Sequence, residues 1–292
     1  MTKLIFSILP LAFVGLAIAG PADPKAIPNS ADWFFHVDMD KLAQGTMAEL
    51  LGELDDEAEN PMRFFEIQDG RTTGGFTLYG SITDPEDTVL IMSGMNRDEL
   101  IEEVSDSKKY KTEEYKDYTI HSWNEKTGNR RGDKQKVTMA FIDKNSAIVT
   151  ARQKVLLEAL DLHEKGGNDS REALGDGAIV GNVNVDAIRQ EVDPEAALFD
   201  LAKEIEFSVQ LTEDDVLVGA FHMKSANQDR ADRLRRMVDG MVAFASEAAE
   251  HEGLWAPDEN FEIEQDGKVI EVRFTIPVKE LKRMMFDRDL II

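Results

Sequence analysis

The sequence contains no cysteine and has few basic residues. Of its 292 residues, 33 are Lys or Arg and 57 are Asp or Glu, so the formal net charge is −24. The lack of cysteine excludes disulfides, thiolate metal sites and cysteine nucleophiles. The excess of acid argues against nucleic-acid binding, because a protein that contacts phosphates needs a basic surface. We therefore expect no nucleic-acid partner, and a fold that depends on its hydrophobic core.

The common catalytic and cofactor motifs are also missing. The sequence has no Gly-x-Ser-x-Gly elbow, no phosphate-binding Gly-x-x-x-x-Gly-Lys loop, no His-Glu-x-x-His pair and no complete EF-hand loop. The glycines within residues 175–181 precede a predicted strand instead of following one, which does not fit a dinucleotide-binding fingerprint. These absences favour a protein that is not an enzyme, and we expect no cofactor.

The first 19 residues have the pattern of a signal peptide. Lys3 supplies a positive charge, residues 4–17 are almost wholly apolar, and small residues occupy Ala17 and Ala19. We predict cleavage between Ala19 and Gly20, and hence a periplasmic or secreted protein. A retained membrane anchor is the alternative, but the apolar run is shorter than the roughly 20 residues that span a bilayer. We expect no stable membrane insertion after cleavage.

An internal repeat follows a proline-rich lead at residues 20–30. Residues 33–42 align without gaps on residues 179–188, and each segment reads as a strand that ends in an aspartate before a helical pattern. We expect Asp40 and Asp186 to cap these helices at their N-termini. Each copy then continues with a hairpin, a helix, further strands and a last helix.

These patterns predict an α+β fold built from two related βαββαββα units. Each unit contains the split βαβ order of ferredoxin-like domains, with mainly antiparallel sheets and helices packed on one face. We place the first unit at residues 31–165, a glycine-rich linker at 166–177 and the second unit at 178–292. The longest predicted helix covers residues 228–250, where apolar residues recur every three or four positions. The pattern leaves open whether the two units share one sheet.

One group of residues has a possible chemical role. His36, Asp38 and Asp40 alternate along a predicted strand, so they share one face and could present an imidazole and two carboxylates to a divalent ion. In the alternative interpretation Asp40 is a helix cap and His36 is partly buried, and the second copy has Asn182 and Asn184 in place of His36 and Asp38. A metal-dependent or carboxylate-based hydrolase that uses these residues is thus the rival hypothesis.

Acidic clusters occur at residues 55–57, 84–87 and 213–215. Carboxylates are the ligands that calcium prefers, so each cluster is a conceivable weak calcium site. None has the alternating spacing of a dedicated calcium loop, and all three lie where a turn or a helix end favours polar residues. We expect ordinary turn chemistry at these positions.

Two basic islands interrupt the acidic sequence. An island of arginines can mark a docking surface for an acidic partner. In the alternative, the arginines of the long helix pair with Asp229, Asp232 and Asp239 on a solvated surface. The candidate interaction residues are Arg130 and Arg131 in a predicted loop, and Arg230, Arg233, Arg235 and Arg236 on the long helix.

The opening strand suggests a relationship to other proteins. Residues 36–40 read His-Val-Asp-Met-Asp and lead into Lys41 and Leu42, just after a signal peptide in a cysteine-free duplicated chain. This layout resembles a group of uncharacterised exported bacterial proteins, and the resemblance implies no activity. The sequence therefore favours an exported, non-catalytic binding or interaction protein, whose partner is a protein or small molecule that the sequence does not identify.

Overall fold

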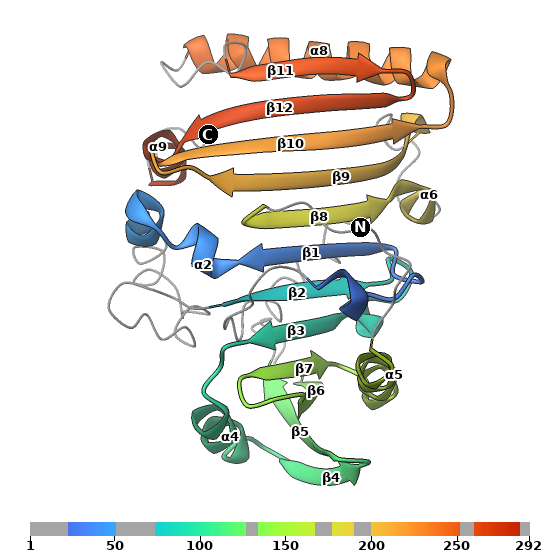
Figure 1. Ribbon diagram of the computed structural model, residues 1–292, viewed down its shortest axis with the longest axis vertical. Coiled ribbons are helices and arrows are strands. Elements are labelled where there is room, and N and C mark those ends of the chain that lie inside the picture. The colour runs from blue at the N-terminus through green and yellow to red at the C-terminus, as the bar shows by residue number, and fades with distance from the viewer. Residues whose placement is uncertain are drawn as a thin grey trace. The chain divides into compact units, whose positions relative to one another are not determined.

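The protein has a mixed α+β fold with extensive antiparallel sheet and few helices (Figure 1). The computed structural model describes residues 23–50, 74–126, 134–166, 177–189, 200–251 and 260–286. The chain divides into two compact units. Unit 1 comprises residues 1–40 and 54–174, and unit 2 comprises residues 41–53 and 175–292.

Seven strands form the sheet of unit 1, in the order β1-β2-β3-β7-β6-β5-β4. The strands are β1 (Trp33–Asp38), β2 (Gly75–Gly80), β3 (Val89–Ser93), β4 (Lys111–Tyr115), β5 (Tyr118–Lys126), β6 (Lys134–Phe141) and β7 (Ser146–Thr150). The helical elements are η1 (Pro24–Ala26), η3 (Pro85–Asp87), α4 (Arg97–Ser105) and α5 (Gln153–Glu164), and α2 (Met39–Leu42) lies where the chain passes into unit 2.

Helices contact both faces of the sheet in unit 1. Asp161 of α5 accepts a hydrogen bond from the Tyr115 hydroxyl at 2.9 Å. The Arg97 guanidinium of α4 lies 5.0 Å from the centre of the Phe141 ring. Tyr115 and Phe141 belong to opposite faces, because alternate residues of a strand point to opposite sides and the strand register is continuous from β4 to β6. All six residues of β2 are buried, as expected for a strand covered on both sides.

Five strands form the sheet of unit 2, in the order β8-β9-β10-β12-β11. The strands are β8 (Ile179–Asn184), β9 (Ala202–Leu211), β10 (Val216–Ser225), β11 (Phe261–Asp266) and β12 (Val269–Pro277). The helices are α6 (Val185–Ile188), α8 (Gln228–His251) and α9 (Val278–Phe286), and residues 45–50 are also helical.

Helix α8 covers one face of the sheet in unit 2. Its buried residues Ala231, Leu234 and Val238 belong to one core cluster with Ile270 and Val272 of β12. Four phenylalanines, one from each of four adjacent strands, form a row across the sheet, with neighbouring ring centres 5.6 to 6.0 Å apart. The members of this row are Phe207, Phe221, Phe274 and Phe261.

A glycine of β10 makes room for one of these rings. A Cβ atom built on Gly219 would lie 2.2 Å from Cζ of Phe274, which is far inside van der Waals contact. Gly219 and Phe274 are register partners on β10 and β12. Any larger residue at position 219 would therefore displace the Phe274 ring from the core.

The strand order corrects the predicted ferredoxin-like arrangement. A split βαβ unit needs neighbouring parallel strands, whereas every strand pair described within the two units is antiparallel. The mainly antiparallel α+β fold was predicted, but the strand order was not. The helix-on-one-face arrangement also fails in unit 1, where α4 and α5 contact opposite faces. Helix α8 covers the predicted residues 228–250 and extends one residue further.

Neither predicted helix cap is found at its aspartate. Helix α6 begins at Val185, and its cap is Asn184, whose side chain accepts a hydrogen bond from the Asp186 amide at 3.1 Å. Asp40 lies inside α2, and its carboxylate accepts a hydrogen bond from the Gly74 amide at 2.8 Å. The prediction of two aspartate caps was wrong because both helices begin before their aspartates.

Residues 41–53, which the repeat pattern assigns to the first unit, belong to unit 2. The Asp215 carboxylate accepts hydrogen bonds from the Thr46 amide at 3.0 Å and the Thr46 hydroxyl at 2.6 Å. Gly45 has φ of +53°, and a Cβ atom there would lie 2.2 Å from Oδ1 of Asp215. The acidic turn that ends at Asp215 thus binds the first turn of the helical segment 45–50, which fits the expected turn chemistry.

No helix in the part of the chain that the structure describes is both long enough and apolar enough to cross a membrane.

Candidate interaction surface

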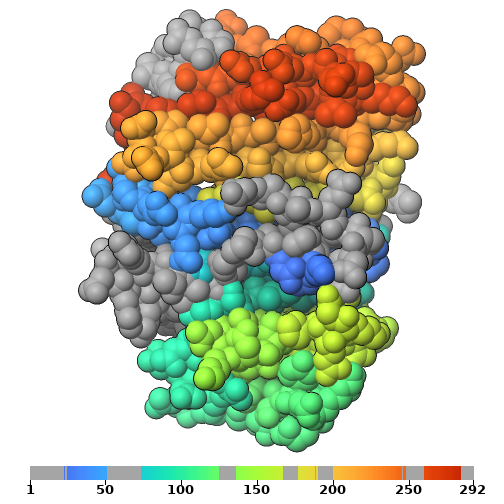
Figure 2. Space-filling model, in the orientation of Figure 1, coloured from blue at the N-terminus to red at the C-terminus, as the bar shows by residue number. Residues whose placement is uncertain are grey.

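The face of the unit 2 sheet opposite α8 carries polar and charged side chains. Strand β11 alternates between half-buried and exposed residues, the pattern of a sheet with one solvated face. The side chains of Glu262 and Glu264 are 75% and 64% exposed. In Figure 2, β10, β11 and β12 lie at the molecular surface on this side. We call this the open face, and define it by residues Asn182, Glu204, Glu206, Val218, Ala220, His222, Lys224, Glu262, Glu264, Glu271 and Arg273.

Arg273 binds three glutamates at the β11–β12 side of the open face. Its guanidinium lies 3.5 Å from Glu262, 3.0 Å from Glu264 and 2.9 Å from Glu271. Hydrogen bonds to Glu264 and Glu271 raise the pKa of Arg273. Burial acts to raise the pKa of Glu271, but the hydrogen bond and charge of Arg273 outweigh it, so the pKa lies below its ordinary value. These four side chains therefore form one network of ion pairs.

A second network lies on the same face. The Lys224 ammonium is 3.2 Å from Oε2 of Glu204, and the Asn182 amide donates to Oε1 of the same carboxylate at 2.9 Å. His222 Nε2 lies 3.4 Å from Oε1 of Glu271. The open face, as defined, contains five glutamates against one lysine, one arginine and one histidine. Its chemistry therefore suits a partner that carries positive charge.

The residues of the rival metal hypothesis lie in unit 1. His36 and Asp38 are 1% and 2% exposed, and His36 Nδ1 is 2.9 Å from the Thr77 hydroxyl of the neighbouring strand. Asp40 binds the Gly74 amide. Among the residues that the structure describes, no three His, Asp or Glu side chains are grouped so that they could hold one metal ion. Within the described residues, His36, Asp38 and Asp40 therefore do not form a group that could hold a metal ion.

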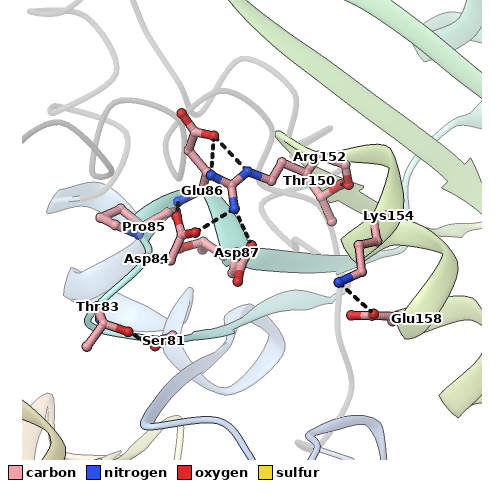
Figure 3. Close-up of polar contacts among 11 residues, drawn as sticks. Ser81, Thr83, Asp84, Pro85, Glu86, Asp87, Thr150, Arg152, Lys154 and Glu158 are labelled. Carbon is pink, nitrogen blue, oxygen red and sulfur yellow. Dashed lines mark hydrogen bonds and ion pairs between the residues drawn. The ribbon is translucent and has the colours of Figure 1, made fainter.

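The acidic turn at residues 84–87 binds an arginine (Figure 3). The Arg152 guanidinium lies 2.5 Å from Asp84, 2.6 Å from Glu86 and 2.9 Å from Asp87. Hydrogen bonds to Asp84 and Glu86 raise the pKa of Arg152. The carboxylates of this turn are thus paired with a cation of the chain itself. The other acidic cluster, at residues 55–57, lies outside the described residues.

Of the predicted interaction arginines of α8, one forms an ion pair with another described residue of the chain. Arg235 lies 3.6 Å from Asp239, as the pairing hypothesis expects. Asp232 instead accepts hydrogen bonds from Gln228 and Gln265, which lower its pKa. Within the described part of the chain, Arg230, Arg233 and Arg236 form no ion pair. Arg130 and Arg131, and the predicted cleavage site at Ala19 and Gly20, lie outside the described residues.

One buried histidine was not predicted from the sequence. His121 of β5 is 4% exposed, and its Nδ1 lies 2.8 Å from the Tyr110 hydroxyl. Burial and then the charge of Arg97 lower the pKa of His121, so the neutral form is favoured in the fold. The only signal in the sequence was its place in a predicted strand, which does not distinguish a buried face from a solvated one.

Comparison with known proteins gives no assignment. No family model matches the chain, and no curated protein or solved structure is significantly similar to it. The functional conclusion therefore depends on the geometry of the two units alone.

Proposed function

We propose that this is an exported, non-catalytic interaction protein, and that the open face of unit 2 is its binding surface. The observation that carries the proposal is the ordered charge network around Arg273 on a solvated sheet face. Exposed ion pairs contribute little to the free energy of folding. The small stability contribution expected of this network favours a role in binding over a role in holding the fold. Such a pattern selects partners by electrostatic complementarity.

The proposed partner is a cationic segment of another protein. Glu262 and Glu264 are largely exposed, so each can accept hydrogen bonds from lysine or arginine side chains without a change in the fold. Val218, which is 40% exposed, adds an apolar contact on the same face. This combination supports a protein partner more than a small molecule.

The binding test uses a labelled oligolysine peptide and the mature chain. The double variant Glu262→Gln, Glu264→Gln should weaken peptide binding about tenfold in fluorescence anisotropy, because two attractive charges are lost. The matched control is Glu99→Gln, Glu102→Gln on α4, two exposed glutamates of unit 1. Equal weakening in both variants would show attraction to the net charge alone, and would refute a dedicated surface.

We also propose export with cleavage after Ala19. The apolar segment at residues 4–17 and the small residues before Gly20 support it. Intact mass measurement of the protein recovered from the periplasm or culture medium should give a chain that begins at Gly20. A chain that keeps residues 1–19 in the membrane fraction would contradict the proposal.

We further propose that the two units arose by duplication. The strand order β1-β2-β3-β7-β6 in unit 1 parallels β8-β9-β10-β12-β11 in unit 2, and in the chain a helix follows the third and the fourth strand of each series. In this account β4 and β5 are an addition to unit 1. The parallel order supports common ancestry independently of the sequence alignment.

A further inference from the structure

The outer side of α8 carries a stripe of exposed residues. The helix buries Ala231, Leu234 and Val238 against the sheet. Successive helix residues are turned by 100°, so the side of α8 opposite these buried residues carries positions 233, 236, 240, 244 and 247. The steps between these positions are three, four, four and three residues. We call these positions the α8 stripe: Arg233, Arg236, Gly240, Phe244 and Glu247, all of them exposed.

The stripe includes the most exposed large apolar side chain described in the protein. Phe244 is 74% exposed, and Met241 beside it is 58% exposed. Burying an exposed phenylalanine is favourable by roughly 1.5 to 3 kcal/mol. An exposed Phe-Met pair on a regular helix is therefore a potential contact site for another surface.

Gly240, at the centre of the stripe, packs closely against no described residue of its own chain. A Cβ atom built there would meet nothing within 4 Å. Glycine inside a helix is less favourable than alanine by about 1 kcal/mol. A glycine at an exposed helix position is explained if another backbone approaches closely at that point.

The stripe is complementary to a second copy of itself. Its spacing is symmetric about Gly240, so an antiparallel second α8 places Gly240 against Gly240, Arg236 against Phe244, and Arg233 against Glu247. The second of these contacts is a cation–π pair, and the third is an ion pair. Arg233 and Glu247 are 14 positions apart in one helix, about 21 Å along its axis, so they can meet only between copies.

We propose that the protein forms a two-fold symmetric dimer through the α8 stripe. The same patch then serves on both copies, as a two-fold interface requires. A second copy is favoured over an acidic partner because the stripe carries both members of its ion pair. Because the contact involves one helix from each copy and both chains are acidic, we expect a weak, reversible dimer.

The main test is a charge reversal measured by sedimentation equilibrium on the mature chain at about 0.15 M salt. Wild type should show a concentration-dependent monomer–dimer equilibrium. Arg233→Glu and Glu247→Arg should each raise the dissociation constant at least about tenfold, because two attractive pairs become repulsive. The double variant R233E/E247R restores both pairs and should recover dimerisation. Matching circular dichroism melts would verify that every variant is folded.

A second readout uses the absence of native cysteine. Gly240→Cys places one thiol on the proposed two-fold axis, so mild oxidation should give a disulfide-linked dimer. The matched control is Asp239→Cys, which is exposed on the same helix but turned by 100° from position 240. Preferential cross-linking at position 240 would support the interface.

Several outcomes would overturn the proposal. These are a wild-type chain that stays monomeric at all concentrations, a dimer unaffected by Arg233→Glu, a double variant that fails to recover, or equal cross-linking at positions 239 and 240. Binding to vesicles of anionic lipid tests a membrane contact as the alternative. If wild type forms no dimer and Arg233→Glu abolishes vesicle binding, the stripe is a membrane contact. Oligolysine binding by the open face is measured separately, so its failure does not affect this test.

Discussion

Each unit has an arginine that binds three carboxylates, but the two clusters connect different parts of the chain. In unit 1, Arg152 at the start of α5 reaches Asp84, Glu86 and Asp87, which lie 65 to 68 positions away in the chain. In unit 2, Arg273 binds glutamates of its own strand and of the adjacent strand β11. The first cluster ties a turn to a helix, whereas the second organises a solvated face. An acidic chain can thus neutralise its carboxylates between distant segments or between neighbouring strands.

The two sheets also differ in how many of their faces are covered by helices. In unit 1, β2 is buried throughout, and helices contact both faces. In unit 2, β11 alternates between half-buried and exposed residues, and α8 covers one face. A strand with two covered faces has no position where an unpaired charge meets solvent, whereas a strand with one covered face has such a position at every second residue. This difference can be tested position by position.

The largest effect is expected from a charge placed on a covered face. Ile148 of β7 is 1% exposed, and Val218 of β10 is 40% exposed. Ile148→Asp should lower the free energy of unfolding by more than about 4 kcal/mol or prevent folding, because it buries an unpaired carboxylate. Val218→Asp should cost less than about 1 kcal/mol. Urea denaturation gives both values, and similar losses would show that the open face is not solvated.

The covered face of unit 2 is tested by Gly219→Ala. The added methyl group collides with the Phe274 ring, so the variant should lose about 1 to 3 kcal/mol in the free energy of unfolding. Ala220→Val is the control, since it adds two methyl groups to the next residue of β10, which points to the open face. It should change stability by less than about 0.5 kcal/mol. A larger loss for Ala220→Val would reverse the assignment of the two faces.

His121, one of the two buried histidines described in unit 1, predicts a pH-dependent stability. Because burial lowers the pKa of His121 in the fold, the unfolded chain takes up the proton first as the pH falls. Stability is therefore full above about pH 6.5 and declines below it, by about 1.4 kcal/mol for each pH unit in which only the unfolded chain is protonated.

The measurement compares urea unfolding at several pH values between neutral and mildly acidic. His121→Gln should flatten the pH dependence that belongs to this group, whereas His222→Gln, whose side chain is 43% exposed, should leave it in place. Loss of the pH dependence in His222→Gln instead would place the titrating group on the open face.

The smallest effect is expected from the two arginine clusters. The Arg152 and Arg273 side chains are 41% and 42% exposed, so solvent screens their ion pairs. Arg152→Gln and Arg273→Gln should each lower the melting temperature only slightly, and high salt should reduce the difference from wild type. Thermal unfolding at low and high salt measures this. A loss that does not change with salt would indicate a packing role for the arginine stems.

The local elements of the fold could be predicted from the sequence better than their arrangement. Apolar periodicity and turn residues indicated α8 and the hairpin of β11 and β12 because these signals lie within a few residues of each other. Strand β4 was missed because its sequence, Lys-Thr-Glu-Glu-Tyr, has no apolar alternation. The strand order was missed because it depends on contacts between distant segments, which local patterns do not encode.

The candidate site shows the same limit. The arginines of α8 were noticed as an island, but the symmetric spacing around Gly240 has meaning only once the buried side of the helix is known. The open face was not predicted because its glutamates are scattered over three strands. His36 and Asp38 share a face as expected, yet both are buried, and burial depends on the segments that cover them.

The hydrogen bonds between Thr46 and Asp215 affect the order in which the molecule can be completed. They join positions 169 residues apart, and both positions belong to unit 2. During synthesis from the N-terminus, residues 41–53 are made long before the turn that binds them. Their hydrogen bonds to Asp215 can therefore form only after the rest of unit 1 has been synthesised. Unit 2 therefore cannot be completed as an uninterrupted C-terminal stretch. A fragment cut at residue 175 would leave the Asp215 carboxylate without Thr46.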